Sequence, residues 1–451
     1  MSGPKVDTMG AAAAGLGSAG AFLRRHWAWL AGLAVAIVLP WLFYDYGAGR
    51  QSGFVLSMTS LIGVMMIFAM SYNVLLGQTG LLSFGHAIYY GLGGYVAIHV
   101  LNMMEQGSWL VAWLPTELLP VVGGLWSALF GAIFGIVMAP HRAVAFAMIT
   151  LGIGELVTQV AITFHSFFGG ENGITAWRDS GWSLFGITYG RDIEVYYLIV
   201  AWLFLSVLAL FLLTRTPLGH MANAARDNFE RTQYVGYDYR RVRYIQIIIS
   251  AFFAGVAGSL FAMKDEILTF ESLGILLSAN VLIMTFIGGA SVFFGPMVGA
   301  IVVVLMQTWI GGISSAWMLY IGALFIFMVM YAPMGIAGLI MRHEPYWRTG
   351  LMRRLWLPYL RTGIPIVITL GGAVAIVETL AWLTIGKAQG RSLHLYWMHL
   401  AGPSDQGVPV LVWLVSIACL LFGGILTWHE GKRTARILEE LDRTLKPEDA
   451  P

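Results

Sequence analysis

The sequence predicts an all-α polytopic membrane protein, and three observations lead to that prediction. Only 11% of the 451 residues are charged, whereas a typical soluble domain carries about 25%. Hydrophobic residues make up 58% of the chain, and its mean hydropathy is +0.74. The apolar residues also gather in runs of membrane-spanning length, without the alternation of a barrel strand. So little charge cannot coat a surface that faces water, and a chain that crosses a bilayer many times is expected.

Twelve apolar segments are long enough to cross a bilayer, which takes about twenty residues per helix. Each is expected to be a helix, because a helix satisfies its own backbone hydrogen bonds in lipid. One long stretch is divided at the glycine-rich "GGASVFFGP", since a single span there would place the arginines of the next loop outside. The expected spans are 27–46, 54–75, 82–101, 111–139, 143–165, 194–213, 244–263, 275–294, 296–311, 316–341, 364–386 and 408–428.

Lys and Arg concentrate in segments that the alternation of spans places on one side, namely the first-span flank, the 214–243 loop, the 342–363 loop and the tail. Positive charge marks the cytoplasmic side, so both termini are expected in the cytoplasm and the 166–193 loop outside. The Gly/Ala-rich residues 1–26 are expected to form a disordered cytoplasmic leader. The segment after them lacks a cleavage site, which favours an uncleaved first span over a signal peptide.

The densest charge lies in "ARDNFERTQYVGYDYRRVR", residues 225–243, between two uncharged spans. Thr216 followed by Pro217 is typical of a helix start, because a hydroxyl caps the first turn and proline suits its first position. Gly236 is typical of a helix end. The interval 217–236 is therefore predicted to be an amphipathic helix outside the membrane.

Opposite charges repeat four residues apart within this predicted helix. Arg226 with Glu230, and Asp227 with Arg231, have the spacing that stabilises a helix surface. Phe229 belongs to a short apolar stripe on the same segment. Two interpretations stand: a connecting loop that holds the inside-facing charge, or a rigid docking helix for a partner protein.

One predicted span carries a polar stripe. Gly152, Glu155, Gln159 and Thr163 share one helical face at spacings of three and four residues. A carboxylate at the bilayer centre costs about 2.5–3.5 kcal/mol on insertion scales, so this face must meet protein or water. It is either a hydrogen-bonded contact between helices or a wall of a translocation path.

Two glycine-rich segments, 77–94 and 288–299, occur once in each half of the chain. Such a pair is typical of broken helices at a transport site, or of small residues that let helices cross closely. His86 lies with Ser83 on one face of the first segment, and a packed core histidine is the alternative to a path residue. The candidate path residues are Asn73, Ser83, His86, Glu155, Gln159, Gly288 and Gly289.

Enzymatic chemistry is not indicated. The segments "HEPYW" and "HEGKR" lack the second histidine of H-E-x-x-H, and no G-x-S-x-G elbow occurs, so no catalytic residue and no metal site are expected. No G-x-x-x-x-G-K-[ST] loop occurs either, so this chain is not expected to cradle ATP phosphates or to bind a cofactor. Membrane lipid is an expected partner and nucleic acid is not. The single cysteine, Cys419, leaves no role for disulfides.

Five segments, in order, resemble the LIV-type, branched-chain amino acid permeases of bacterial ABC importers. The resemblance runs over residues 53–340. Glu230 and Gly236 have the spacing of the EAA…G loop of such permeases, with Arg231 and Thr232 in place of its two alanines. The segments are "SYNVLLGQTGLLSFGHAIYYGLGGYVA", "MITLGIGELV", "GGENGI", "ARDNFERTQYVGYDYRRVRYIQIIISAFFAGVAGSLFA" and "IGGASVFFGPMVGA".

The resemblance implies about ten core transmembrane helices, to which the chain adds two C-terminal spans. It implies a subunit of the bacterial cytoplasmic (inner) membrane that pairs with a second permease chain, often a different one. Two cytoplasmic ATPases would bind ATP, and a periplasmic binding protein would deliver the solute. Branched-chain amino acids are the leading substrate class, while urea, short amides and aromatic acids stay open. The ATPase-coupling residues would be Arg226, Asp227, Phe229, Glu230 and Gly236.

Alternatives to an importer subunit remain at this point. The paired glycine segments and Glu155 are compatible with a stand-alone secondary transporter, and a non-transporting membrane scaffold is a third possibility. The expected organisation is a leader at 1–26, a permease domain at 27–342 and an extension at 343–451. That extension is a membrane anchor, a partner-binding module or the remnant of another gene.

Overall fold

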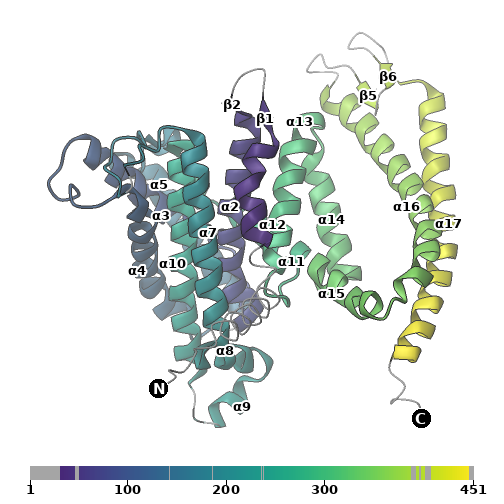
Figure 1. Ribbon diagram of the computed structural model, residues 1–451, viewed down its shortest axis with the longest axis horizontal. Helices are drawn as coiled ribbons and strands as arrows, with labels where there is room; N and C mark the ends of the chain where they lie inside the picture. The colour runs from purple at the N-terminus through teal and green to yellow at the C-terminus, as the bar shows by residue number, and fades with distance from the viewer. Residues whose placement is uncertain are drawn as a thin grey trace, which may run out of the picture. The chain divides into compact units, whose positions relative to one another are not determined.

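The described chain is almost entirely helical (Figure 1). Its strands form only three two-stranded pairs within the described residues, so the all-α polytopic membrane class is confirmed. The predicted leader lies outside the described residues. The computed structural model describes residues 31–45, 50–141, 143–184, 186–234, 236, 238–386, 393–395, 398–401 and 408–445.

The chain divides into two compact units, residues 1–285 with 296–304 and residues 286–295 with 305–451. A helix over Ala31–Leu42 opens the described part of unit 1. The other helices of unit 1 are α2 (Gly53–Asn73), α3 (Ala87–Glu105), α4 (Leu119–Met138), α5 (Ala143–Thr163), α6 (His165–Phe168), α7 (Asp192–Arg215), α8 (Pro217–Asp227), α9 (Phe229–Tyr234) and α10 (Tyr239–Asp265).

Helix α11 (Ile275–Gly288) begins in unit 1 and ends in unit 2, and α12 (Gly295–Leu305) belongs to unit 1 except for its first and last residues. Unit 2 then contains α13 (Gly311–Ile313), α14 (Trp317–Tyr331), α15 (Gly335–Arg348), α16 (Met352–Ala381) and α17 (Val410–Leu445). Short π-helical segments are η1 (Val74–Gln78), η5 (Met306–Ile310) and η6 (Trp382–Gly386). The strand pairs are β1 (Tyr44–Asp45) with β2 (Arg50–Gln51), β3 (Ile174–Thr175) with β4 (Ile267–Leu268), and β5 (Leu393–Leu395) with β6 (Met398–Ala401), all antiparallel.

Helices α3, α4 and α10 pack around glycines at the centre of unit 1. A Cβ at Gly258 would lie 1.8 Å from the carbonyl oxygen of Tyr90, and one at Gly93 would lie 2.5 Å from the Cα of Gly255. Ser259 Oγ donates a hydrogen bond to the Gly93 carbonyl at 3.1 Å. Small residues let membrane helices approach closely, so that van der Waals and hydrogen-bond contacts replace the hydrophobic effect.

Against the twelve predicted spans, eight helices of the described residues, or up to nine with one bent pair, are long and apolar enough to cross a membrane, and two shorter apolar helices cover Ala31–Leu42 and Ile275–Gly288. The 82–101 span begins only at Ala87, because the glycine-rich residues before it are not helical. The 275–294 span shortens to the 14 residues of α11, about 21 Å of a core that is about 30 Å thick. The 316–341 span is α14 and α15, bent by 46°.

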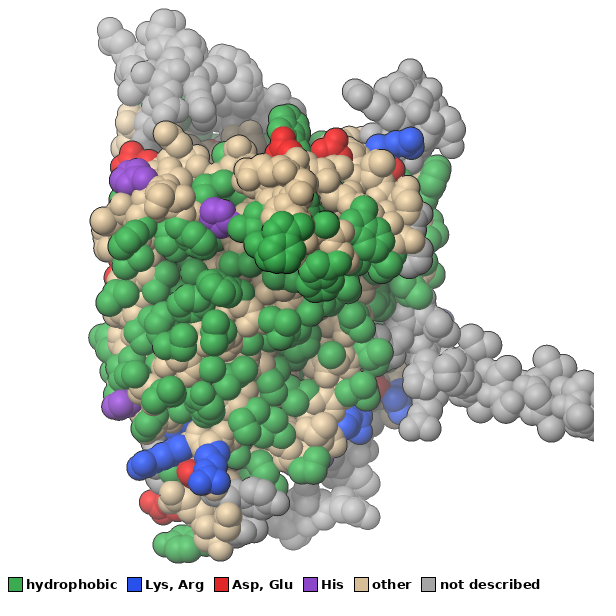
Figure 2. Space-filling model, turned by 90° about the vertical axis from the view of Figure 1, so that its left-hand side faces the viewer, with side chains coloured by type: hydrophobic (Ala, Val, Ile, Leu, Met, Phe, Trp, Pro, Cys, Tyr) green, Lys and Arg blue, Asp and Glu red, His purple; other side chains and the backbone are tan. Residues whose placement is uncertain are grey.

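The surface that unit 1 presents in Figure 2 is a broad field of hydrophobic side chains, with most charged side chains near its two ends. Such a band is expected where a helix bundle faces lipid hydrocarbon. The largest fully buried side chains of the chain include aromatic residues of this unit, such as Tyr72, Tyr95 and Phe68. Unit 1 therefore has a dry aromatic core and an apolar outer face.

Candidate functional site

The charged segment begins as predicted. Thr216 Oγ1 accepts a hydrogen bond from the backbone N–H of Gly219 at 3.3 Å, and Pro217 occupies the first turn of α8. Gly236 has φ +92°, a conformation that favours glycine, after the end of α9. The expected cap and the expected stop are both confirmed.

A single helix over 217–236 is wrong. Asn228 is extended (φ −156°, ψ 102°) and separates α8 from α9. Asparagine disfavours helix interiors, because its side chain competes for backbone hydrogen bonds. The pairing of Arg226 with Glu230 across this break is not formed, and Arg226 Nε instead bonds Asp227 Oδ1 at 3.0 Å. The docking candidate is therefore two short helices with a bend between them.

One side of this two-helix element is buried and the other is open. Ala222 and Ala225 are buried, whereas Asp227 and Glu230 are exposed. Tyr234, which the sequence reasoning missed, is 88% exposed. The side chain of Phe229 lies outside the described ones. An exposed tyrosine beside charged residues is typical of protein-binding surfaces, and its position just before the glycine stop was the signal available in the sequence.

Arg226 ties the two-helix element to the membrane core. Its Nη1 donates a hydrogen bond to the carbonyl oxygen of Gly77, 149 residues earlier in the chain. Gly80 has φ +67°, and a Cβ there would lie 2.9 Å from Arg226 Cγ. The arginine stem thus lies over the turn between α2 and α3, where only glycine leaves it room.

That turn is a true helix break, as the glycines predicted. Helix α2 continues as η1 to Gln78, residues 80–85 are not helical, and α3 begins at Ala87. Thr150 of α5 accepts a hydrogen bond from the Phe84 N–H at 3.1 Å, and Ser278 accepts one from the Ala87 N–H at 2.9 Å. The broken segment is therefore held by hydroxyls from two other helices.

His86 lies in the core beside this break and is fully buried. Its Nε2 and Ser71 Oγ are 3.0 Å apart, and its ring stacks on Phe68 with 5.4 Å between centroids. Tyr72 donates its hydroxyl to the Ser83 carbonyl at 2.9 Å. Ser83 and His86, together with Asn73, are therefore buried inside unit 1 in this structure.

The core around the break is rich in polar atoms that lack a hydrogen-bond partner among the described residues. They include Asn73 Oδ1, Gln78 Oε1, His86 Nδ1 and both amide atoms of Gln246 on α10. A buried polar group left unpaired costs about 1–3 kcal/mol. A water molecule, a bound solute or a second conformation that pairs these atoms would remove this cost.

Glu155 and Gln159 face away from the rest of the chain. Both are exposed, as is Gly152, whereas Thr158 on the other side of α5 is buried and bonds the Gly154 carbonyl at 2.9 Å. Helix α5 thus has one face packed inside unit 1 and a polar face that its own chain does not cover. An ionisable side chain in this position requires a partner surface or water.

In the second glycine segment, the backbone at Gly289 lies directly against the backbone at Met334 and Gly335, inside unit 2. Gly289 has φ +110°, and a Cβ there would lie 2.1 Å from the Met334 carbonyl oxygen. A Cβ at Gly335 would lie 2.3 Å from the Gly289 Cα. Gly288 ends α11 just before this contact. The glycines at 288–289 thus permit a close backbone approach, in line with the packing alternative.

The buried Arg178 anchors the loop predicted to lie outside through ion pairs with more exposed carboxylates. Arg178 bonds Asp192 Oδ1 at 2.7 Å, lies 3.7 Å from Glu266 Oε1, and donates to the Gly190 carbonyl at 3.1 Å. Burial, with a hydrogen bond to Glu117, raises the pKa of Tyr189 in this loop above its usual range. The loop is therefore a fixed surface, not a loose connection.

The C-terminal extension contributes one intramembrane carboxylate that the sequence reasoning passed over. Tyr320 of α14 donates its hydroxyl hydrogen to Glu378 Oε1 of α16 at 2.7 Å.

The histidine of the "HEPYW" segment has a partner within unit 2. His343 Nε2 lies 2.6 Å from the Tyr359 hydroxyl oxygen. Among the described residues no group of three or more His, Cys, Asp or Glu side chains could hold a metal ion.

Known proteins match more than half of this chain in sequence. Residues 54–332 match the sequence profile described as "Branched-chain amino acid transport system / permease component". The "High-affinity branched-chain amino acid transport system permease protein LivM" of Escherichia coli (strain K12) is 28% identical over 298 residues, which cover 61% of this chain and 68% of that protein. The protein of the same name from Salmonella typhimurium is 28% identical over 325 residues, 67% and 73% of the two chains. No solved structure matches the chain.

Proposed function

Because the chain belongs to the family of branched-chain amino acid transport system permease components, we propose that it is the membrane-spanning permease subunit of an ATP-driven importer. The family match, which covers residues 54–332, carries this proposal. Branched-chain amino acids are the proposed cargo, since the two relatives bear that substrate in their names. Import would run from periplasm to cytoplasm across a bacterial inner membrane.

The proposed partners are those that such an importer requires. Two ATPase subunits would bind ATP, and one of them would dock on α8 and α9, where Asp227, Glu230 and Tyr234 are exposed. A second permease chain would cover the polar face of α5, so that Glu155 and Gln159 line the path between the two chains. A periplasmic binding protein would dock on the outer face, where Arg178 fixes the loop.

The contacts around Arg226 suggest how docking could act on the path. Movement of α8 by an ATPase would pull on the Gly77 carbonyl and on the turn at Gly80. The unpaired atoms of Asn73, Gln78 and Gln246 lie in the elements that this turn joins or packs against. A small displacement at the docking element would therefore shift the least satisfied part of the core.

Orientation is part of the proposal, with both termini and α8–α9 in the cytoplasm. A single cysteine at position 240, on a Cys419→Ala background, should react with a membrane-impermeant maleimide only after the membrane is opened. Reaction from outside in intact cells would reject both the orientation and the docking assignment.

The functional test is reconstitution. The chain is co-expressed with the candidate second permease chain and ATPases, and leucine uptake into proteoliposomes is measured with the candidate binding protein and ATP. Uptake that requires ATP and the binding protein supports the proposal. Uptake by this chain alone, driven by a proton or sodium gradient, would instead establish a secondary transporter.

A further inference from the structure

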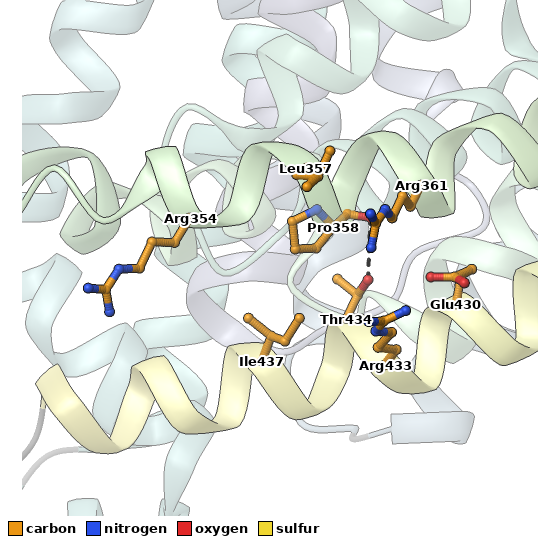
Figure 3. A pocket seen from close by; sticks show the side chains of 8 residues that line it. All are labelled: Arg354, Leu357, Pro358, Arg361, Glu430, Arg433, Thr434 and Ile437. Atoms are coloured by element: carbon orange, nitrogen blue, oxygen red, sulfur yellow. Dashed lines mark hydrogen bonds between the residues drawn. The ribbon is translucent and has the colours of Figure 1, made fainter.

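The two C-terminal helices form a pocket outside the residues that match the family profile. It lies inside unit 2, between α16 and α17, and its volume is about 230 Å³ (Figure 3). The lining residues come from one face of each helix, at positions i, i+3, i+4 and i+7. They are Arg354, Leu357, Pro358 and Arg361 of α16, and Glu430, Arg433, Thr434 and Ile437 of α17.

The pocket is a widening in a tight interface. On one side the Thr362 and Thr434 hydroxyl oxygens lie 2.8 Å apart. On the other side Leu355, which is fully buried, packs with Tyr346 and Leu441. Because α16 and α17 are in contact at both ends of the pocket, the distance between its walls is fixed.

The pocket carries excess positive charge. Three arginines and one glutamate line it, and Figure 3 shows Arg361 and Arg433 directed into the space between the helices, beside Glu430. Within the described part of the chain, Arg354, Arg361 and Arg433 take part in no ion pair. Like charges facing one another across a helix interface repel, so a bound anion would stabilise this arrangement. Guanidinium groups match phosphate oxygens in shape and charge.

The position of the pocket along α16 and α17, relative to the membrane interface, indicates which kind of anion it would bind. On α17 the Lys432 Nζ lies 3.6 Å above the ring of Trp428, a pairing suited to the membrane interface. Arg433 follows Trp428 by five residues, about 7.5 Å along the helix axis. Apolar residues precede Trp428, and Ile364 of α16, three residues after Arg361, is 57% exposed. The arginines are thus at the depth of lipid headgroups, directly beside the hydrocarbon.

We infer that this pocket binds the headgroup of an anionic membrane phospholipid. The arginines hold the phosphodiester. Ile364 of α16, on the hydrocarbon side of Arg361, contacts the first carbons of an acyl chain. A phosphocholine head has no net charge, so it binds more weakly. Basic pockets between membrane helices recognise lipid headgroups in this way.

The experiment counts lipids retained by the full-length protein in native mass spectrometry. Delipidated protein is titrated with phosphatidylglycerol, with phosphatidylcholine or with inorganic phosphate. The pocket variant is Arg361→Gln/Arg433→Gln. Its matched control is Arg353→Gln/Arg436→Gln, which removes the same charge from the same two helices at exposed positions outside the pocket.

The pocket variant should bind phosphatidylglycerol about 30-fold more weakly, since each cation near an anionic lipid contributes about fivefold. The control should bind like the parent, and thermal unfolding of both variants should confirm that they fold. Equal loss in pocket variant and control would overturn the site, because only general charge attraction would remain. No preference for phosphatidylglycerol over phosphatidylcholine, or displacement of the lipid by millimolar inorganic phosphate, would overturn the lipid assignment in favour of no site or a soluble anion site.

Discussion

The guanidinium of Arg226 donates a hydrogen bond to the Gly77 carbonyl, and its stem lies against the turn at Gly80. The contact joins the two-helix element α8–α9 to the broken helix that leads into the core around His86. If a partner protein moved α8, this charge-assisted hydrogen bond would transmit the movement to the turn at Gly80.

Replacing Arg226 by Gln should uncouple ATP hydrolysis from uptake. A hydrogen bond to a charged group contributes about 1.5–3 kcal/mol, so uptake per ATP should fall by about tenfold or more. Hydrolysis itself should continue, because the ATPase still docks. Uptake and phosphate release are measured together in proteoliposomes. Arg215→Gln, which removes a cation stacked on Phe211 at the end of α7, is the control. Equal coupling ratios in both variants would contradict the proposed link.

Docking itself should depend on the exposed side of α8 and α9. Glu230→Ala combined with Tyr234→Ser should weaken capture of the ATPase, since loss of an aromatic contact residue typically costs about 2 kcal/mol. The fold should not change, because both side chains are exposed. Pull-down of the ATPase, normalised to the protein in the membrane, provides the measurement. Unchanged capture would reduce this segment to a charged connector.

The outward face of α5 should tolerate loss of charge and not loss of polarity. Glu155→Gln keeps a hydrogen-bonding group, so expression and most of the uptake should persist. Glu155→Leu should lower uptake severalfold while thermal stability of the isolated chain stays close to that of the parent, because the side chain makes no internal contact there. If Glu155→Gln alone abolishes uptake at normal expression, the carboxylate charge itself is required in the path.

The glycine packing of unit 1 should be sensitive to one added side chain. Gly258→Val places atoms on the Tyr90 carbonyl, and overpacking of this kind costs about 1–3 kcal/mol or more. Gly424→Val in α17 is the control, because nothing lies within 4 Å of a Cβ there. Thermal unfolding of the purified variants should show a lowered midpoint for the first only. Equal midpoints would mean that α3 and α10 can separate at little cost.

Local sequence signals predicted part of this structure. Thr216, Pro217 and Gly236 predicted where the two-helix element α8–α9 begins and ends, because helix caps depend on neighbouring residues. The bend at Asn228 was missed, since asparagine lowers helix propensity by only about 0.7 kcal/mol and the outcome depends on tertiary packing. The polar stripe at Glu155 was visible from periodicity, but its outward direction was not. The contact of Arg226 with Gly77 spans 149 residues, and no local pattern encodes such a distance.

The hydroxyl of Tyr320 and the carboxylate of Glu378 join the last helix of the family region to the added helices. The extension is therefore joined to the family region by a side-chain hydrogen bond as well as by the chain itself. A gene fusion that exchanged everything after residue 342 for another segment would cut α15 in its middle and remove Glu378, which accepts the Tyr320 hydrogen bond.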